Sequence, residues 1–288
     1  MNSRSEIPNP QLKARDRILD LSRPIIMGIL NVTPDSFSDG GQYFEPARAV
    51  EHGLRMVEEG AAIIDIGGES TRPGSAPVPE DEQIRRTVPV IAGLLRQADL
   101  AISIDTTSGA VARAALEAGA GIINDISALR FDPEMLPLAA RTQAAVILMH
   151  MLGTPSTMQQ APTYGDVVAE VRDFLAQRLA YAQAQGIPPE RLVIDPGIGF
   201  GKTLEHNLLL LRHLDELARL HPLLLVGPSR KAFLGMILDA PDPERRLMGT
   251  AAACAWSLLH GARILRVHDV REIAQLARVL DSILDFRF

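Results

Sequence analysis

Eight short apolar runs recur along the chain, and their spacing restricts the fold more than any other feature of the sequence. Each run is bounded by glycine, proline or a charged residue, which is typical of a strand buried on both faces of a parallel sheet. Segments with helical spacing separate the runs. The runs are Ile25–Leu30, Ala62–Ile66, Ala101–Ile104, Gly121–Ile123, Ala145–Met149, Leu192–Ile194, Leu223–Val226 and Ile264–Val267.

The segments between these runs complete a repeating strand–helix pattern. Several carry start or stop signals, such as Ser108 before one helix and Gly60 after another. Eight alternating units predict an α/β fold whose parallel strands close into a (β/α)8 TIM barrel. An open doubly wound sheet is the alternative, but the sequence has no GxGxxG turn after the first strand to favour it. The clearest helices are Ala47–Glu59, Asp81–Arg96, Gly109–Ala118, Gly165–Gln185, Glu205–Arg219, Glu244–His260 and Val270–Leu284.

Length and composition favour a single domain. A chain of 288 residues suits one barrel, so we expect the domain to span residues 23–288. Residues 1–22 lack a convincing apolar period, and we expect them to form a loosely attached, flexible arm. The net charge of −6 argues against a nucleic-acid partner.

The expected compartment follows from the cysteine count and from the hydropathy pattern. Cys254 is the only cysteine, which excludes an intrachain disulfide and a cysteine-based zinc site. The sequence shows no secretory signal pattern and no apolar run near the ~20 residues that span a bilayer. We therefore expect a cytoplasmic protein with no membrane partner.

Polar side chains follow every predicted strand, at or just beyond its carboxyl end. In a barrel these ends converge on one mouth, where active sites lie. Loops are commonly polar, so a polar residue after one strand would mean little, but polar residues after all eight strands predict a common site. They are Asn31, Asp65, Asp105, Asn124, His150, Asp195, Ser229, and Arg266 with His268.

Two of these strand ends contain glycine-rich or basic motifs. DPGIGFGKT, residues 195–203, fails as a phosphate-binding P-loop because Pro196 stands where the first glycine is required. Its turn could instead let a flat ligand lie against the backbone and stack on Phe200, or Phe200 could be a core residue. GPSRKAFLG, residues 227–235, is expected to place Ser229 at a helix N-terminus, with two cations in the first turn as an anion site.

Lys231, Arg266 and His268 supply the basic side chains of the expected site. Lys231 could be a Schiff-base nucleophile, as in a barrel aldolase, but a role as an ammonium donor is favoured because nearby carboxylates would keep it protonated. Arg266 and His268 lie on the same side of the last strand, where barrels often bind phosphate. The alternative for this pair is a structural salt bridge with Asp269. The sequence contains no transition-metal motif, and Mg2+ carried in with a pyrophosphate suits the oxygens of Asn31 and Asp39 better.

Taken in order, the motifs resemble those of the dihydropteroate synthases, the pterin-binding enzymes of folate biosynthesis that sulfonamides inhibit. The resemblance extends from Pro24 to Val270. It implies a TIM barrel, usually a homodimer, that joins a dihydropterin hydroxymethyl diphosphate to 4-aminobenzoate and releases pyrophosphate. The matching blocks are GILNVTPDSFSDGG, DIGGESTRPG, SIDT, NDIS, LMHM, GTPSTMQ, DPGIGFGKT, EHNL, GPSRK and RVHD.

The same resemblance implies a role for individual residues. Mg2+ would be held by Asn31 and Asp39, and the diphosphate by Arg266 and His268. Ser229 would bind the aminobenzoate carboxylate. The residues implied at the pterin are Asp105, Asn124, Met149, Asp195, Phe200, Gly227 and Lys231. The residues implied over the aminobenzoate, in two loops that would close as a lid, are Phe37, Thr71, Arg72 and Pro73.

Two other functions remain alternatives. A barrel that transfers a methyl group from methyltetrahydrofolate to a corrinoid would share the acidic pterin pocket, but it would not need a diphosphate clamp at Arg266 and His268. A catalytically silent paralogue acting as a binding protein should have lost some of the site residues. Asn31, Asp105 and Lys231 are all present.

Overall fold

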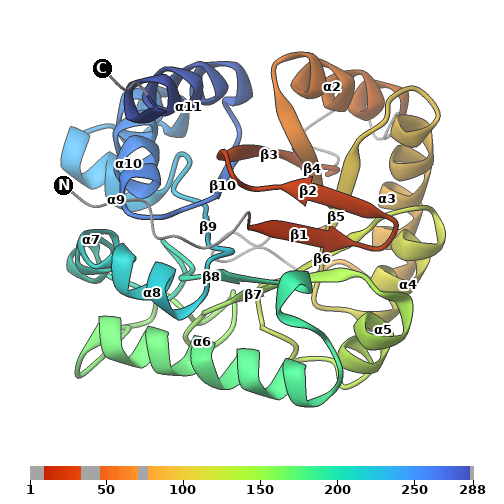
Figure 1. Ribbon diagram of the computed structural model, residues 1–288, viewed down its shortest axis with the longest axis horizontal. Coiled ribbons are helices and arrows are strands. Elements are labelled where there is room, and N and C mark those ends of the chain that lie inside the picture. The colour runs from red at the N-terminus through yellow and green to blue at the C-terminus, as the bar shows by residue number, and fades with distance from the viewer. Residues whose placement is uncertain (1–9, 34–45, 71–76, 286–288) are drawn as a thin grey trace.

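A closed ring of parallel strands surrounded by helices makes up the molecule (Figure 1). The computed structural model describes residues 10–33, 46–70 and 77–285. The ring is an eight-stranded sheet with the strand order β8-β7-β6-β5-β4-β3-β10-β9. Its strands are β3 (Ile25–Asn31), β4 (Ala61–Gly67), β5 (Ala101–Asp105), β6 (Ile122–Asp125), β7 (Ala145–Met149), β8 (Leu192–Asp195), β9 (Leu225–Val226) and β10 (Ile264–Val267). Each coincides with a predicted apolar run.

The first and last strands of this order meet and close the barrel. Ile194 of β8 and Leu224, just before β9, form a parallel bridge. The Ile194 N–H donates to the Leu223 carbonyl at 2.9 Å. The predicted TIM barrel is therefore confirmed, with a single narrow seam between β8 and β9.

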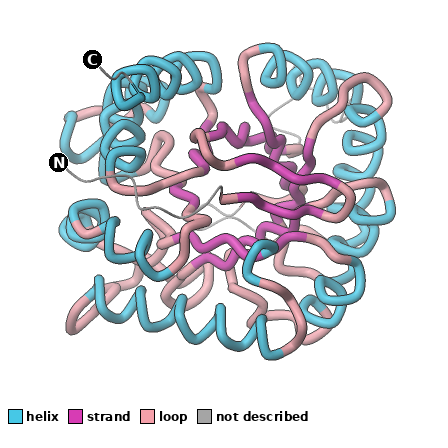
Figure 2. Tube along the Cα trace, in the orientation of Figure 1, coloured by secondary structure: helices cyan, strands magenta, loops and turns pink. Residues whose placement is uncertain are grey.

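Helices cover the outside of the barrel, as the cyan and magenta tubes of Figure 2 show. The predicted helix over 205–219 is two helices, because His213 leaves helical geometry (φ −108°, ψ 26°). The short helix α5 was not predicted, and α9 begins later than the helix expected after Ser229. The helices are α2 (Pro46–Glu58), α3 (Glu80–Leu95), α4 (Gly109–Glu117), α5 (Met135–Thr142), α6 (Val167–Ala184), α7 (Leu204–Arg212), α8 (Leu214–Leu220), α9 (Ala232–Leu238), α10 (Leu247–Leu259) and α11 (Val270–Asp285), with 3-10 turns at Pro189–Arg191 and Pro243–Arg246.

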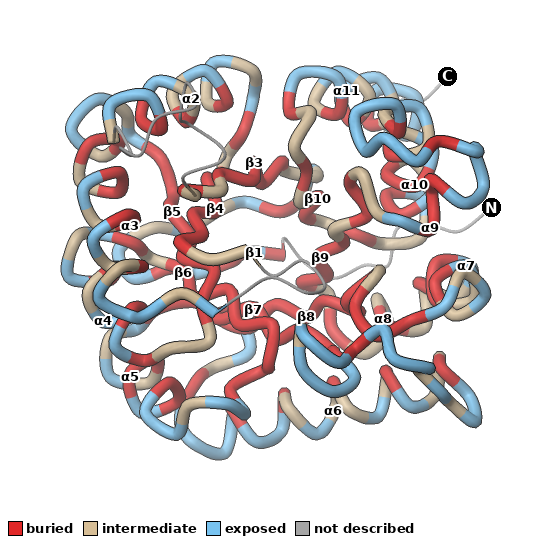
Figure 3. Tube along the Cα trace, turned by 180° about the vertical axis from the view of Figure 1, so that it is seen from behind, coloured by how far each residue is buried: buried red, intermediate tan, exposed pale blue. Residues whose placement is uncertain are grey.

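Alternate residues of each strand serve two different hydrophobic cores. Ile64 and Ile66 of β4 face the helices and belong to the larger core. Ile63 of the same strand faces into the barrel and packs in a smaller core with Met27 and Ile122. This follows from the two-residue period of a strand. Figure 3 shows the result, with the strands buried along most of their length.

A hairpin seals the end of the barrel where the strands begin. Strands β1 (Gln11–Ala14) and β2 (Arg17–Asp20) pair antiparallel. Leu12 is fully buried and packs in the same core as the barrel-facing side chains of the strand starts. The expectation of a loosely attached arm is therefore wrong for this part of residues 1–22, because alternate hairpin side chains are buried. Residues 1–9 lie outside the described ranges.

No helix within residues 10–33, 46–70 and 77–285 is long and apolar enough to cross a membrane.

Candidate active site

The other end of the barrel, where the strands finish, holds a cavity lined by residues from six strand ends. Eight of its lining residues were predicted from the sequence. Parallel strands deliver them to one place because each follows, or closes, an apolar run. These eight are Asp105, Asn124, Met149, Asp195, Phe200, Gly227, Lys231 and Arg266.

Arg266 lines this cavity and bridges two carboxylates. Its Nε donates to Asp65 Oδ2 at 2.6 Å, and its Nη2 donates to Asp105 Oδ2 at 2.7 Å. Both distances are in the range of charge-assisted bonds. Three strands that are far apart in sequence, β4, β5 and β10, are thus joined through one guanidinium.

Asp65 also positions the amide of Asn124. Its Oδ2 accepts a hydrogen bond from Asn124 Nδ2 at 3.0 Å, in addition to the bond from Arg266. The second oxygens of the two carboxylates, Asp65 Oδ1 and Asp105 Oδ1, are buried without a hydrogen-bond partner among the described residues. A buried carboxylate oxygen of this kind is costly unless a ligand or water binds it.

The electrostatics of the cavity favour protonation of its acids. Burial raises the pKa of Asp105 to about 7, against the opposing effect of Arg266. Burial likewise raises the pKa of Asp195 to about 6, although the Gly197 N–H donates to this carboxylate at 2.7 Å. These groups therefore titrate close to neutral pH, where small changes in their surroundings alter their charge.

The glycine-rich turn after β8 places Phe200 beneath Lys231. Lys231 Nζ lies 3.9 Å from the centroid of the Phe200 ring, a cation–π contact. Gly199 permits this approach, since a Cβ on it would come within 2.8 Å of Lys231 Cδ. Phe200 also packs with Met149 and Ile126. Phe200 was expected either to stack on a flat ligand or to pack in the core. In the structure its side chain forms part of the cavity wall, packed against core residues.

The basic segment after β9 differs from its prediction. Helix α9 begins at Ala232, so Ser229 and the two cations precede it rather than form its first turn. The reason is Arg230, whose backbone adopts a left-handed conformation (φ 58°) and whose guanidinium pairs with Asp269 at 2.6 Å and 3.0 Å. Ser229 is therefore not at the helix N-terminus where it was expected, and Asp269 pairs with Arg230 rather than with Arg266 or His268.

Ser229 and His268 contact one another at the rim of the site. Ser229 Oγ lies 3.0 Å from His268 Nδ1 and accepts from the His268 backbone N–H at 3.2 Å. Burial, with Arg266 nearby, lowers the pKa of His268 to about 3. The imidazole is thus neutral at physiological pH, which suits a hydrogen-bond donor and not a proton source.

Part of the predicted site lies outside the described residues. Asn31 ends β3 beside Gly67 of β4, at the same end of the barrel as the cavity. Within the described ranges there is no group of three or more His, Cys, Asp or Glu side chains that could hold a metal. The predicted residues outside the described ranges are Phe37, Asp39, Thr71, Arg72 and Pro73.

Sequence comparison bears on what this cavity binds. A family model described as "Pterin binding enzyme" matches residues 27–268. A dihydropteroate synthase from Synechocystis is 51% identical over 261 residues, which cover 91% of this chain and 90% of the relative.

The chain belongs to the dihydropteroate synthase family.

Solved structures of that family have the same fold. The dihydropteroate synthase of Xanthomonas albilineans with 4-aminobenzoic acid superposes with a TM-score of 0.91 at 48% identity, covering 97% of this chain and all of the other. That of Yersinia pestis in a sulfonamide drug complex gives a TM-score of 0.90 at 45% identity, covering 96% and 100%. The resemblance inferred from the motifs is thus confirmed.

Three side chains in or beside this site had no predicted role. Asp65 was recognised as a strand-end residue only, although a carboxylate inside the apolar run AAIIDIG was a signal that it must be paired in the interior. His150, also a strand-end residue, is not among the residues lining the cavity and contacts Lys202, whose Nζ lies 3.0 Å from His150 Nδ1. Lys202 was read only as part of the turn motif.

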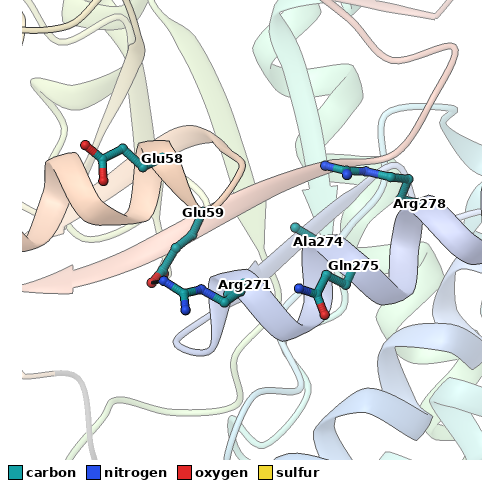
Figure 4. A pocket seen from close by; sticks show the side chains of 6 residues that line it. All are labelled: Glu58, Glu59, Arg271, Ala274, Gln275 and Arg278. Carbon is teal, nitrogen blue, oxygen red and sulfur yellow. Dashed lines mark hydrogen bonds and ion pairs between the residues drawn. The ribbon is translucent and has the colours of Figure 1, made fainter.

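Another cavity lies on the helical shell, between α2 and α11. Figure 4 shows its lining side chains, with Glu59, just after α2, close to Arg271 of α11, and with Glu58 and Arg278 further apart on either side. Glu59 and Arg271 form an ion pair at 3.1 Å. These are solvated surface charges, and they share no residue with the strand-end cavity.

Proposed function

We propose that this chain is a transferase of a pterin-methyl group, a dihydropteroate synthase. It would join (7,8-dihydropterin-6-yl)methyl diphosphate to 4-aminobenzoate, giving 7,8-dihydropteroate and pyrophosphate. The observation that carries the proposal is the cavity itself, in which carboxylates, an amide, a lysine and an arginine converge between apolar walls. Membership of the family gives the reaction class.

The polar groups of the cavity match the edge of a pterin. The amino-pyrimidinone ring offers N–H donors to the carboxylates of Asp105 and Asp195. Its carbonyl oxygen and ring nitrogens accept from Lys231 and from Asn124. Met149 and Phe200 supply apolar surface for its faces, as flat ligands require.

Arg266 would connect pterin binding to departure of the leaving group. In the structure its guanidinium is held by Asp65 and Asp105, and the side chain, 17% exposed, lines the cavity. A diphosphate placed there gains a fixed positive charge, and His268 adds a neutral N–H donor at the rim. Stabilising the departing pyrophosphate in this way lowers the barrier to breaking its C–O bond.

The bond-forming step needs little help from a general base. When the C–O bond breaks, its electrons leave with pyrophosphate, and the positive charge that remains is spread over the pterin. The carboxylates of Asp65, Asp105 and Asp195 would stabilise this cation. The lone pair of the arylamine, which is neutral at pH 7, then forms the C–N bond, and the resulting ammonium releases a proton.

The donor set at the mouth fits a magnesium ion brought by the diphosphate. Mg2+ bound to a diphosphate keeps several waters and needs only one or two protein oxygens. Asn31 Oδ1 can supply one, and Asp39 is proposed as the other. When bound, the ion would neutralise charge on the leaving pyrophosphate.

Further proposals concern the second substrate and the molecular context. We infer that 4-aminobenzoate binds toward the rim near Ser229, with Phe37, Thr71, Arg72 and Pro73 over it. Sulfonamides, which share its shape, would compete for that place. The protein is proposed to be a cytoplasmic homodimer.

The test is a direct assay with the purified protein. With Mg2+, the dihydropterin diphosphate and 4-aminobenzoate, we expect stoichiometric pyrophosphate and dihydropteroate. Parallel reactions supply methyltetrahydrofolate with a corrinoid. Release of no pyrophosphate would refute the proposal, and methyl transfer in the parallel reactions would replace it with the methyltransferase alternative.

A further inference from the structure

Lys202 is a buried lysine for which the proposed chemistry has no use. The lysines of the chain are Lys13, Lys202 and Lys231. Lys202 is 3% exposed, lies directly after the glycine-rich turn and does not line the cavity. Its ammonium donates to the carbonyls of Gly197 at 3.0 Å and Phe200 at 2.9 Å. It is therefore bound to both ends of the turn that carries Phe200.

The same ammonium also reaches the end of β7. Lys202 Nζ lies 3.0 Å from His150 Nδ1 and 3.4 Å from the His150 carbonyl. Burial lowers the pKa of His150 to about 2, so its imidazole is neutral and Nδ1 accepts the hydrogen bond. His150 directly follows Met149, which packs with Phe200 in one apolar cluster. Lys202 thus joins the two segments that form the apolar walls of the cavity.

Burying a charged lysine here would not be the best way to stabilise the fold. No carboxylate lies within ion-pair distance of Lys202 among the described residues, and burial lowers the pKa of its amine to about 7. A buried charge of this kind costs free energy that an apolar side chain of the same length would not. Its bonds to the turn that carries Phe200 therefore point to a role in the site.

The turn itself requires an external support. Gly197 adopts a left-handed conformation (φ 66°), and a Cβ there would come within 2.0 Å of the His150 carbonyl. The turn is therefore in close contact with the chain after β7. Within the turn, the Phe200 N–H donates to the Gly197 carbonyl at 3.0 Å, and Lys202 binds that same carbonyl. Without the ammonium, the Phe200 carbonyl would lose its hydrogen bond in the interior.

We propose that Lys202 is a positioning residue: it clamps the turn of residues 197–201 to the end of β7 and so fixes the Phe200 ring against Lys231 and opposite Met149. This inference rests on the proposed function for the identity of the ligand. It assigns Lys202 to the recognition of the pterin and leaves the aminobenzoate site untouched. It also explains why a lysine, with several donors on one atom, occupies the position.

Steady-state kinetics separate this role from a general structural one. Lys202→Met keeps the unbranched stem and removes the ammonium. We expect the KM for the dihydropterin diphosphate to rise by about tenfold or more, with less than about a twofold change in the KM for 4-aminobenzoate. Lys13→Met, which removes the exposed lysine paired with Glu190, is the matched control and should change neither value. Equal rises in both KM values, or a fall in kcat alone, would overturn the proposal.

A double-mutant cycle tests whether Lys202 acts through Phe200. Phe200→Leu alone should raise the pterin KM, and adding Lys202→Met to it should raise that KM by less than about twofold more. Fully multiplicative effects would contradict the proposal. Should Lys202→Met fail to fold, Lys202→Gln, which keeps an N–H donor but not the charge, is expected to show the same selective rise in the pterin KM at a smaller size.

A measurement on the protein without substrate distinguishes failure of this inference from failure of the proposed function. With 4-fluorophenylalanine at position 200, the fluorine NMR signal should be a single line in the parent and should shift or broaden in Lys202→Met. An unchanged line would refute the positioning role even if the parent is an active synthase. If the parent releases no pyrophosphate but the fluorine signal still shifts in Lys202→Met, the proposed function is refuted and the positioning role is supported.

Discussion

The two ends of this barrel are built from the same strands and differ in almost every physical respect. Where the strands begin, the interior is apolar and the β1–β2 hairpin covers it, with Leu12 fully buried. Where they end, the interior holds Asp65, Asp105, Asn124 and Arg266 around a cavity. One end stabilises the molecule by burying apolar surface, and the other accepts buried charge in order to bind a ligand.

A pair of arginines makes the contrast concrete. Arg191, beside the start of β8, is 7% exposed and its Nη2 donates to the carbonyls of Ala139 and Ala144, at 2.5 Å and 2.7 Å. Arg266, in β10, donates to two carboxylates. The carbonyls that Arg191 binds hold the end of α5 and the start of β7 in place. The carboxylates that Arg266 binds instead form a site whose charge changes with pH and with ligand binding.

The largest effect is expected from Arg266→Ala. This change leaves Asp65 and Asp105 buried without their cation, which should cost about 3–5 kcal/mol of unfolding free energy. Loss of charge stabilisation at the leaving group should lower kcat/KM by at least ~100-fold. Chemical denaturation and pyrophosphate release measure the two effects.

Arg191→Ala is the control for that experiment at the opposite end. It should also destabilise the protein, with both KM values unchanged. Arg266→Ala should weaken the affinity for a pterin without the diphosphate far less than the affinity for the dihydropterin diphosphate. Equal losses for the two ligands would show that Arg266 does not contact the diphosphate.

A smaller effect, confined to stability, is expected from Leu12→Ala in the hairpin. Truncating a fully buried leucine costs about 2–5 kcal/mol, set by how well the cavity collapses. Because Leu12 packs among the strand starts, far from the strand-end cavity, kcat and both KM values should remain within about twofold of the parent. Urea denaturation and the kinetic assay check this. Altered substrate binding would break the division between the two ends.

The pH dependence of stability should report on the polar end. Burial raises the pKa of Asp105 from its usual value of 3.8 to about 7 in the folded protein. Between about pH 4 and pH 7 the folded state therefore holds a proton that the unfolded state has lost, so the free energy of unfolding falls as pH rises and levels off above 7. Denaturation of the parent and of Asp105→Asn measures the free energy of unfolding of each. Across this window the value for the parent minus that for the variant should fall by at most a few kcal/mol. A difference that rises with pH would contradict the raised pKa.

The smallest effect concerns a structural residue near the site. Ser108 caps α4 after the strand that ends in Asp105, and its Oγ accepts from the Val111 N–H at 3.3 Å. Ser108→Ala should cost about 1 kcal/mol, typical of a lost helix cap. Thermal denaturation measures the loss, and the KM values should not change. A marked rise in either KM would mean that the cap also orders the site.

Sequence patterns were sufficient for the barrel but not for the hairpin. Each long strand is a continuous apolar run, which is what burial on both faces requires. By contrast, β1 and β2 contain no continuous apolar run, and the alternation in Gln11–Ala14 is too short to distinguish from chance. Their identity as strands depends on the barrel that they cover, which local patterns do not describe.

Within the site, the residues were predictable and their partners were not. Position at a strand end identified Asp105 and Arg266, because parallel strands finish on one side. The pairing of Arg266 with Asp65 depends on how far a long side chain reaches across the closed barrel. Likewise, the left-handed backbone of Arg230 changed the start of α9, and nothing in GPSRK requires that conformation. Tertiary geometry decided both.

The narrow seam of the barrel has a consequence for ligand binding. Among the described residues, β8 is paired with the segment that leads into β9 through one bridge, between Ile194 and Leu224; Asp195 follows one side of it and Lys231 follows the other. A pterin that contacts both side chains would bridge the seam and hold the two segments together. Ligand binding in the cavity should then slow amide hydrogen exchange at Ile194.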